Sequence, residues 1–516
     1  MREVSAGLLV TVAAVPLAIG LADVAGVPPV AGLLTCIWPL VVFALLGSSP
    51  HLKLGMDASS ALLIAATVPA LVAGSPDEYV AVAAGLTLLS GGLILAAGVL
   101  RVGVVADLLS LPVLVGYTAG IAISVMISQL PRMLGYDATG GNDVQLLANT
   151  LGELGSAHGP TVATAAVSFA ALVALRRALP AVPAGAVVLV VGIALSSLLD
   201  LAGRGVATVG TLPSGLPAPS IPGASAATWG ELIVPAVGVA IVIAADSMIT
   251  SRSFATRLHY HLDTNRDLVG LGAANVASAL TGGVAASASY SRTAIAERNG
   301  SRSQLAGVVA AGFMALVLLV LTGALAPTPL ALLSAVVVDA LVRLADPRAF
   351  AGLARVRRVE VGIAVLTTTG VLVVGLLPTI LVAVGCVLLL ALSDLVRAWR
   401  GGREEPRHPR LGRFVPDDGV GPALRCAWHG PLVFLNVERF RRSVLDVTLR
   451  TPDLRTFVLD AGDVTMLDAT AAGMLAELET AMRDRGIGLT VDGLAEPFAR
   501  RLAASRVSDR RAGDAR

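Results

Sequence analysis

The chain has 516 residues, of which 55% are hydrophobic, 14% charged and 4% aromatic. Soluble domains average about 45–50% apolar and about 25% charged residues, so a single water-soluble globule is not expected. About one residue in ten is charged over residues 1–400, against about three in ten over residues 401–516. The net charge of +2 gives no overall basic field, which argues against a nucleic-acid partner.

Apolar stretches recur through the first 400 residues, and many are long enough to cross the hydrocarbon core of a lipid bilayer, which takes about 20 residues of helix. We expect a polytopic α-helical membrane protein with fourteen spans, of which the third and the tenth are unusually short. The expected spans are 5–23, 29–47, 57–73, 79–100, 108–130, 160–178, 184–201, 230–250, 267–283, 289–299, 303–325, 329–345, 359–376 and 378–397.

The basic residues test this topology, because cytoplasmic loops near membrane spans accumulate Lys and Arg. With the N-terminus inside, nearly all Lys and Arg residues of 1–400 fall on the cytoplasmic side. Only Arg132 and Arg204 fall outside, and Arg292 lies at membrane depth. The sorting predicts fourteen spans in the cytoplasmic membrane, with both termini in the cytoplasm.

The pattern changes after the membrane region 1–400. Residues 401–413 form a charged linker with Gly and Pro, and residues 414–516 have the pattern of a small cytoplasmic α/β domain. In that domain we expect strands at 431–437, 455–460 and 487–492, and a helix at 469–484.

Three ionisable residues stand out because they lie at membrane depth: Asp57, Asp246 and Arg292. Such groups are costly there and mark a functional pathway by default. Asp57 opens the short third span and Arg292 lies at the start of the short tenth span, so both positions are expected half-helix N-termini. Opposed half-helices of this kind hold anions in transporters, and a carboxyl that can be protonated is a reasonable coupling group.

Long sequence runs resemble the sulfate permease (SulP) family of anion transporters. These runs are VAAVPLAIGLADVAGVPPVAGLL (12–34), LLGSSPHLKLGMDASSALL (45–63) and the signature from ADSMITSRSFATRL to SRSQLAGVV (245–309). The resemblance implies two inverted seven-span repeats like those of uracil permeases, a core and a gate that work by elevator-like motion, and a homodimer. It also implies a C-terminal STAS domain.

The resemblance further implies which residues form the site. The substrate-binding positions come from the first, third and tenth spans, and the implied set is Val15, Leu17, Asp57, Ala58, Ser59, Ala288, Ser289, Ser291 and Arg292. Asp246 of the eighth span, together with Asp57, is the implied group for the coupling cation. Leu17 stands where many members have Gln, so the substrate of those members is not carried over.

Structural roles compete with several of these interpretations. Asp57 and Asp246 could be helix caps or interhelical hydrogen-bond partners, and Arg292 could neutralise a local carboxylate.

In the STAS-like domain, Thr470 is the closest match to a regulatory phosphorylation position, but N-capping by Asp468 or Thr470 is favoured. Gly270 and Gly272 are expected to permit helix packing rather than to bind a dinucleotide. The three cysteines match no metal or redox spacing, and two of them lie in apolar stretches, where Cys behaves as a small apolar residue.

The sequence therefore predicts a secondary transporter of a small anion, with sulfate, bicarbonate and dicarboxylates left open. Symport with H⁺ or Na⁺ is expected, no cofactor or metal is implied, and no motif of an enzyme or ATPase is found. The alternative is a membrane sensor that binds the anion and signals through the STAS domain without net transport.

Overall fold

The computed structural model describes most of the chain. The described residues are 1–72, 75–102, 111–179, 182–223, 226–342, 347–379, 382, 385, 389, 413–416 and 423–503, apart from 259, 261, 357, 377, 452, 465, 497, 498, 500 and 501. The expected linker 401–413 lies outside the described residues except for Arg413. The expected fourteenth span 378–397 lies almost wholly outside them.

Helices make up most of the described structure before residue 380. They are α1 (Arg2–Val24), α2 (Pro29–Leu34), α3 (Trp38–Leu46), α4 (Ala58–Thr67), α5 (Pro76–Val99), α6 (Leu111–Leu134), α7 (Asp143–Gly152), α8 (Gly159–Ala178), α9 (Ala184–Leu198), α10 (Ala226–Leu258), α11 (Thr264–Leu280), α12 (Tyr290–Arg298), α13 (Leu305–Val320), α14 (Thr322–Leu325), α15 (Leu330–Val342), α16 (Pro347–Val356) and α17 (Arg358–Val373). Two short 3-10 turns, Val68–Ala70 and Leu154–Ser156, lie between them.

Length and composition agree with a polytopic membrane protein. Within the described residues, six segments are long and apolar enough to cross a membrane: α1, α2 together with α3, α5, α6, α8 and α10. Five shorter apolar helices accompany them, namely α4, α9, α13, α15 and α17. The count of fourteen spans stays a prediction.

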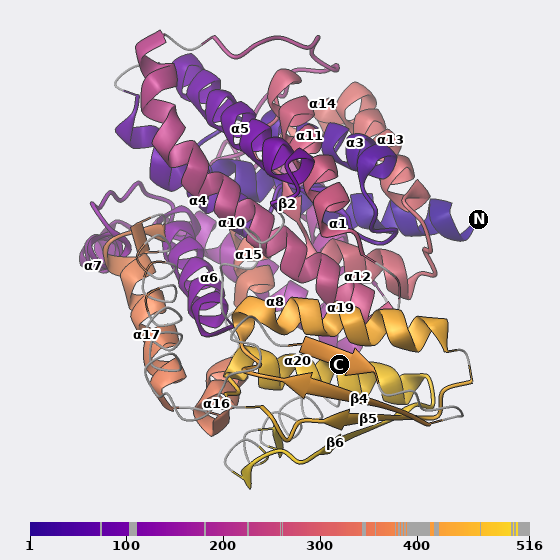
Figure 1. The fold of residues 1–516 in the computed structure, drawn as a ribbon. Helices are drawn as coiled ribbons and strands as arrows, with labels where there is room; N and C mark the ends of the chain where they lie inside the picture. The colour runs from indigo at the N-terminus through magenta and orange to yellow at the C-terminus, as the bar shows by residue number, and fades with distance from the viewer. Residues whose placement is uncertain are drawn as a thin grey trace.

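The helices pack as two bundles (Figure 1). In the first bundle, α5 packs on α10 and α11, α11 packs on α3, and α1 packs on α13. In the second bundle, α6 packs on α15 and α17, and α8 packs on α15 and α9. The two bundles meet where α1 contacts α9 and α15, and where α4 contacts α6.

Three expected spans are interrupted or short. The second is broken at 35–37 between α2 and α3, while the third and tenth are the 10-residue α4 and the 9-residue α12. A two-residue strand precedes each of the two short spans: β1 (Leu54–Gly55) lies before α4, and β2 (Ser287–Ala288) lies before α12. The expectation that α4 and α12 begin at or next to the expected site residues is confirmed.

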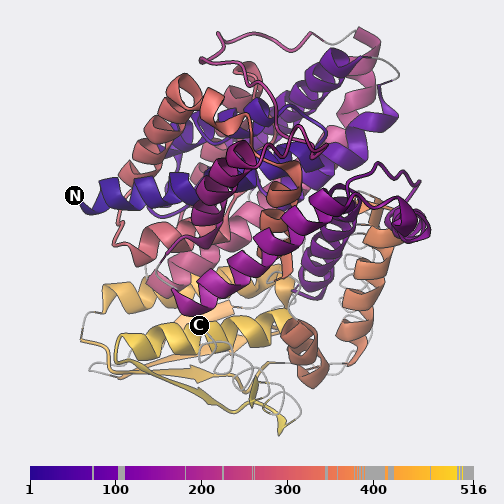
Figure 2. The ribbon, with the colours of Figure 1, turned by 180° about the vertical axis from the view of Figure 1, so that it is seen from behind.

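The C-terminal α/β domain has a four-stranded sheet in the order β3-β4-β5-β6, with β3 antiparallel and the other strands parallel to one another. Its strands are β3 (Arg413–Pro416), β4 (Ala423–His429), β5 (Thr456–Asp460) and β6 (Gly488–Asp492), and its helices are α19 (Phe434–Arg450) and α20 (Ala469–Asp484). The two helices lie between the sheet and the helices of the first 380 residues (Figures 1 and 2).

The expected strands at 455–460 and 487–492 and the helix at 469–484 are confirmed by β5, β6 and α20. The strand expected at 431–437 is wrong, because helix α19 begins at Phe434. Val437, Phe440 and Val444 recur at spacings of three and four and are all buried in the domain core. Two strands were missed: β3, whose first residue Arg413 lies in the expected linker, and β4, which pairs with β5 from Ala423 to Ala427.

Candidate functional site

The starts of α4 and α12 are joined by a short antiparallel ladder. Leu54 of β1 pairs with Ala288 of β2, and Gly55 pairs with Ser287. The Ser289 N–H extends the ladder by donating to the Lys53 carbonyl at 3.0 Å. Two half-helices separated by more than 220 residues of sequence thus begin side by side, so their unpaired N–H groups and positive dipole ends favour an anion at one place.

Asp57 is the N-cap of α4. Its Oδ1 accepts a hydrogen bond from the Ala58 N–H at 2.8 Å, and its own N–H donates to Ser60 Oγ at 3.1 Å. The carboxyl is half-buried and interacts electrostatically with Arg292. Asp57 therefore has the structural role that the sequence left open, at a position that also faces the tenth-span arginine.

Asp246 and its neighbour Ser247 connect α10 to the two half-helix starts. Ser59 Oγ donates to Asp246 Oδ2 at 2.9 Å, and the hydroxyls of Ser59 and Ser287 are 3.4 Å apart. The neighbouring Ser247 Oγ accepts a hydrogen bond from the Ala288 N–H at 3.0 Å. The third, eighth and tenth spans thus share one polar network at the β1–β2 ladder.

Arg292 lies in the first turn of α12, and its side chain is 2% exposed. Nη1 donates to Cys36 Sγ at 3.6 Å. Nε and Nη2 are buried and have no hydrogen-bond partner in the described part of the chain. A buried charged donor without a partner is costly and calls for an explanation such as a bound ion.

The other expected site residues are placed less uniformly. Ala58, Ser59, Ala288 and Ser289 are buried at the ladder, whereas Ser291 is exposed and hydrogen-bonds through its hydroxyl to Ser289 at 3.2 Å. Val15 and Leu17 flank Pro16 of α1 and pack in apolar clusters. Helix α1 contacts both α4 and α12, so it forms an apolar wall beside the polar network.

Several residues near this network were not singled out by the sequence. Cys36 was interpreted as an apolar residue, yet its sulfur contacts the guanidinium of Arg292. Ser247 and Ser287 add hydroxyls, and the signal for both was their place beside Asp246 and before Arg292. Tyr117 of α6 is 1% exposed and packs in the same buried cluster as Ala58 and Ala288, which brings the second bundle to the site.

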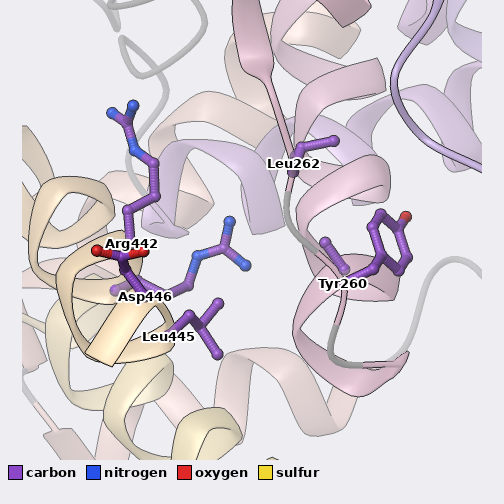
Figure 3. A pocket seen from close by; sticks show the side chains of 7 residues that line it. Tyr260, Leu262, Arg442, Leu445 and Asp446 are labelled. Atoms are coloured by element: carbon purple, nitrogen blue, oxygen red, sulfur yellow. The ribbon is translucent and has the colours of Figure 1, made fainter. Parts of the chain in front are cut away.

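Two hollows in the structure lie elsewhere. One of about 20 Å³, room for about one water, lies between helix α19 and the end of α10 with the residues after it, and Tyr260, Leu262, Leu445 and Asp446 are among its lining residues (Figure 3). The other is lined only by apolar residues, which come from α1, from α9 and from Pro183 just before α9. Neither hollow is lined by residues of the β1–β2 ladder. Within the described residues, no three His, Cys, Asp or Glu side chains are grouped to hold a metal ion.

The C-terminal domain contacts both helical bundles. Arg441 of α19 donates to the Arg252 carbonyl at 2.9 Å and to Thr256 Oγ1, both on α10. Thr470 Oγ1 accepts a hydrogen bond from the Leu111 N–H of α6 at 3.0 Å. Asp468 is the N-cap of α20 and accepts from the Ala471 N–H at 2.8 Å, which confirms the expected capping role.

Two helix N-termini that meet beside a buried arginine, within a polytopic helical bundle, are the arrangement expected of a membrane anion transporter. Residues 1–367 match the Sulfate permease family and residues 423–510 match the STAS domain. The chain belongs to the sulfate permease family, which makes it a transporter rather than an enzyme.

One curated relative and two solved structures illustrate the similarity. A probable sulfate transporter of Mycobacterium tuberculosis is 37% identical over 522 residues, which cover 98% of this chain and 92% of the relative. The overall structure of SLC26A9 matches with a TM-score of 0.72 at 20% identity, covering 97% of this chain and 86% of the other. The transmembrane domain of a cyanobacterium bicarbonate transporter, BicA, matches with a TM-score of 0.66 at 24% identity, covering 74% and 96%.

Proposed function

We propose that this protein is a secondary active transporter that binds a small oxyanion between the N-termini of α4 and α12, with Arg292 as the main charged contact. The observation that carries the proposal is the buried guanidinium of Arg292 at the convergence of two helix starts, with two nitrogens that have no partner among the described residues. Sulfate is the first candidate substrate because the Mycobacterium tuberculosis relative is named for it, and bicarbonate and dicarboxylates are the others.

The coupling group is Asp246. It shares a hydrogen bond with Ser59 of α4, so a proton or Na⁺ taken up at this carboxyl changes the charge beside the anion without leaving the polar network. An anion and an ionised Asp246 repel each other, whereas an anion and a neutralised Asp246 do not. Binding of the two solutes is thereby linked, as symport requires.

Translocation follows an elevator-like exchange between the two helical bundles. Both half-helices, α1 and α10 belong to the first bundle, whereas Tyr117 of α6 approaches the site from the second. Sliding of the first bundle along the second carries the whole polar network with it. We further propose fourteen spans in two inverted repeats, a membrane region of 1–400 with a 401–413 linker and a 414–516 STAS domain, cytoplasmic termini in the cytoplasmic membrane, and a homodimer.

The test is uptake by the purified full-length protein in proteoliposomes. Labelled sulfate, bicarbonate, fumarate and chloride are offered in turn, with an imposed proton gradient, an imposed sodium gradient or neither. We expect accumulation of one oxyanion under one of the two gradients, and no accumulation by Arg292→Ala that retains the melting temperature of the parent. Binding of an anion without accumulation under any gradient would instead identify the sensor.

A further inference from the structure

The three nitrogens of the Arg292 side chain have different surroundings. Nη1 is engaged by Cys36 Sγ at 3.6 Å, whereas Nε and Nη2 have no partner in the described residues. The Asp57 carboxyl interacts with Arg292 only through its charge and makes no hydrogen bond to Nε or Nη2. The guanidinium is therefore occupied on one edge and unoccupied on another.

The unoccupied edge has a defined chemistry. The Nε–H and Nη2–H bonds project in parallel from one side of the planar guanidinium, so they match two oxygen atoms of a single carboxylate or sulfate-like group. A halide has one centre and uses this fork less well. An arginine held in this way favours oxyanions for a geometric reason that a lysine would not share.

Cys36 contacts the Nη1 edge of the guanidinium. It lies in the turn 35–37 that breaks the second span between α2 and α3, and it is 2% exposed. Gly55 of β1 closes the same contact from the other side: a Cβ built at Gly55 would lie 2.9 Å from Cys36 Sγ and 3.0 Å from Arg292 Nη1. Sulfur, guanidinium and strand backbone are in close contact, so this edge has no room for a ligand.

We propose that Cys36 is a positioning residue, which holds Nη1 of Arg292 so that the Nε and Nη2 edge receives two oxygens of the transported oxyanion. The proposal rests on the proposed binding of an anion at Arg292. Because Cys36 lies in the break of the second span, this break helps the site to select oxyanions over halides.

The first arm of the test is kinetic, in proteoliposomes with the full-length protein carrying Cys386→Ser and Cys426→Ser, which leaves Cys36 as the one thiol of the sequence. Sulfate uptake and its inhibition by chloride are compared with those of Cys36→Ala and Cys36→Ser. We expect the alanine variant to raise the KM for sulfate about tenfold, as for loss of a hydrogen bond to a charged group, with a smaller loss of affinity for chloride. Serine, which retains an acceptor, should restore the KM to within about twofold.

The second arm measures alkylation of Cys36 by a small thiol reagent. An oxyanion bound at Nε and Nη2 fixes the guanidinium and keeps Nη1 against Cys36 Sγ, so saturating sulfate should slow the reaction several-fold, and the same concentration of chloride should not. A matched variant that retains only Cys426, buried in the C-terminal domain, should react at one rate with either salt. If Cys36→Ala fails to fold, as judged by its melting temperature, Cys36→Val, which fills the space but has no acceptor, takes its place in the kinetic arm, and the alkylation rates are compared as above.

Wild-type KM and chloride inhibition in a folded Cys36→Ala variant, or alkylation that sulfate does not slow, would overturn the role of Cys36. With Arg292→Ala still inactive, that result would leave the proposed function standing. Normal uptake by a folded Arg292→Ala variant would remove the proposed function itself.

Discussion

Gly55 sets how closely strand β1 approaches the guanidinium of Arg292. Its φ of +152° is one that L side chains rarely adopt, and a Cβ there would be 2.9 Å from Cys36 Sγ and 3.0 Å from Arg292 Nη1. We expect Gly55→Ala to displace the arginine, to cost about 1–3 kcal/mol of stability and to reduce sulfate uptake at least tenfold. Uptake kinetics and the melting temperature in detergent measure the two effects.

Gly92 in α5 supplies the matched control, because a Cβ there meets no atom within 4 Å. Gly92→Ala should keep the KM and melt at the same or a slightly higher temperature, since alanine favours helix. Equal behaviour of the two variants would show that the approach of β1 to Arg292 has no functional importance.

The carboxyl of Asp246 can be neutralised with little change of shape. In Asp246→Asn the side-chain oxygen can still accept from Ser59 Oγ, so the network of α4 and α10 is retained while the charge is lost. We expect gradient-driven accumulation to fall to the level of empty liposomes. Asp77→Asn, at an exposed position in the first turn of α5, should accumulate substrate as the parent does. Unchanged accumulation by Asp246→Asn would exclude it as the coupling group.

The sequence was informative about the site where a residue contrasts with its surroundings. Asp57, Asp246 and Arg292 are charges in apolar stretches, and the structure places all three at or next to one ladder. Cys36 does not contrast with its apolar neighbours, so its contact with Arg292 was hidden. That contact depends on the break at 35–37 and on pairing between strands more than 230 residues apart, neither of which has a local sequence signal.

Helix packing settles the role of the glycines in α11. A Cβ at Gly272 would lie 2.6 Å from Leu95 Cα and 2.7 Å from the Gly91 carbonyl oxygen, both on α5. The packing role expected from the sequence is confirmed, since small residues let two membrane helices approach closely.

This crossing predicts a clear difference in stability between two valine variants. Gly272→Val should separate α5 from α11 and cost about 3 kcal/mol, seen as a lower melting temperature in detergent. Gly312→Val in α13, where a Cβ meets nothing within 4 Å, should melt close to the parent. A tolerated valine at residue 272 would contradict the close contact.

Element prediction was reliable where apolar spacing was unambiguous and failed where it was not. The helix α20 and the strands β5 and β6 followed from their patterns. The run 431–437 is rich in Val, Leu and Phe, which favours strand locally, but its continuation to Val444 has helical spacing and packs on the sheet. The segment forms helix α19 because its buried face packs against β4 and β5. A short stretch of sequence does not contain those strands, so it cannot show this packing.

In the proposed transport cycle the two bundles move against each other, and the structure shows a polar contact between them at one end. Arg132 of α6 pairs with Asp23 of α1. Leu111, at the opposite end of α6, contacts Thr470 of the C-terminal domain. The 24 residues of α6 span about 36 Å, so this ion pair lies about one membrane thickness from the STAS contact.

A reversible cross-link at this ion pair tests the motion directly. Asp23→Cys and Arg132→Cys are introduced with the three native cysteines replaced by serine, and the pair is bridged by a short bifunctional methanethiosulfonate reagent. Because the bridge joins the two bundles, we expect sulfate uptake to stop and to return after reduction. The control bridges Arg176→Cys of α8 and Asp339→Cys of α15, whose side chains pair at 2.5 Å within the second bundle, and it should leave uptake unchanged. Undiminished uptake with the 23–132 bridge formed would rule out sliding between α1 and α6 as the transport step.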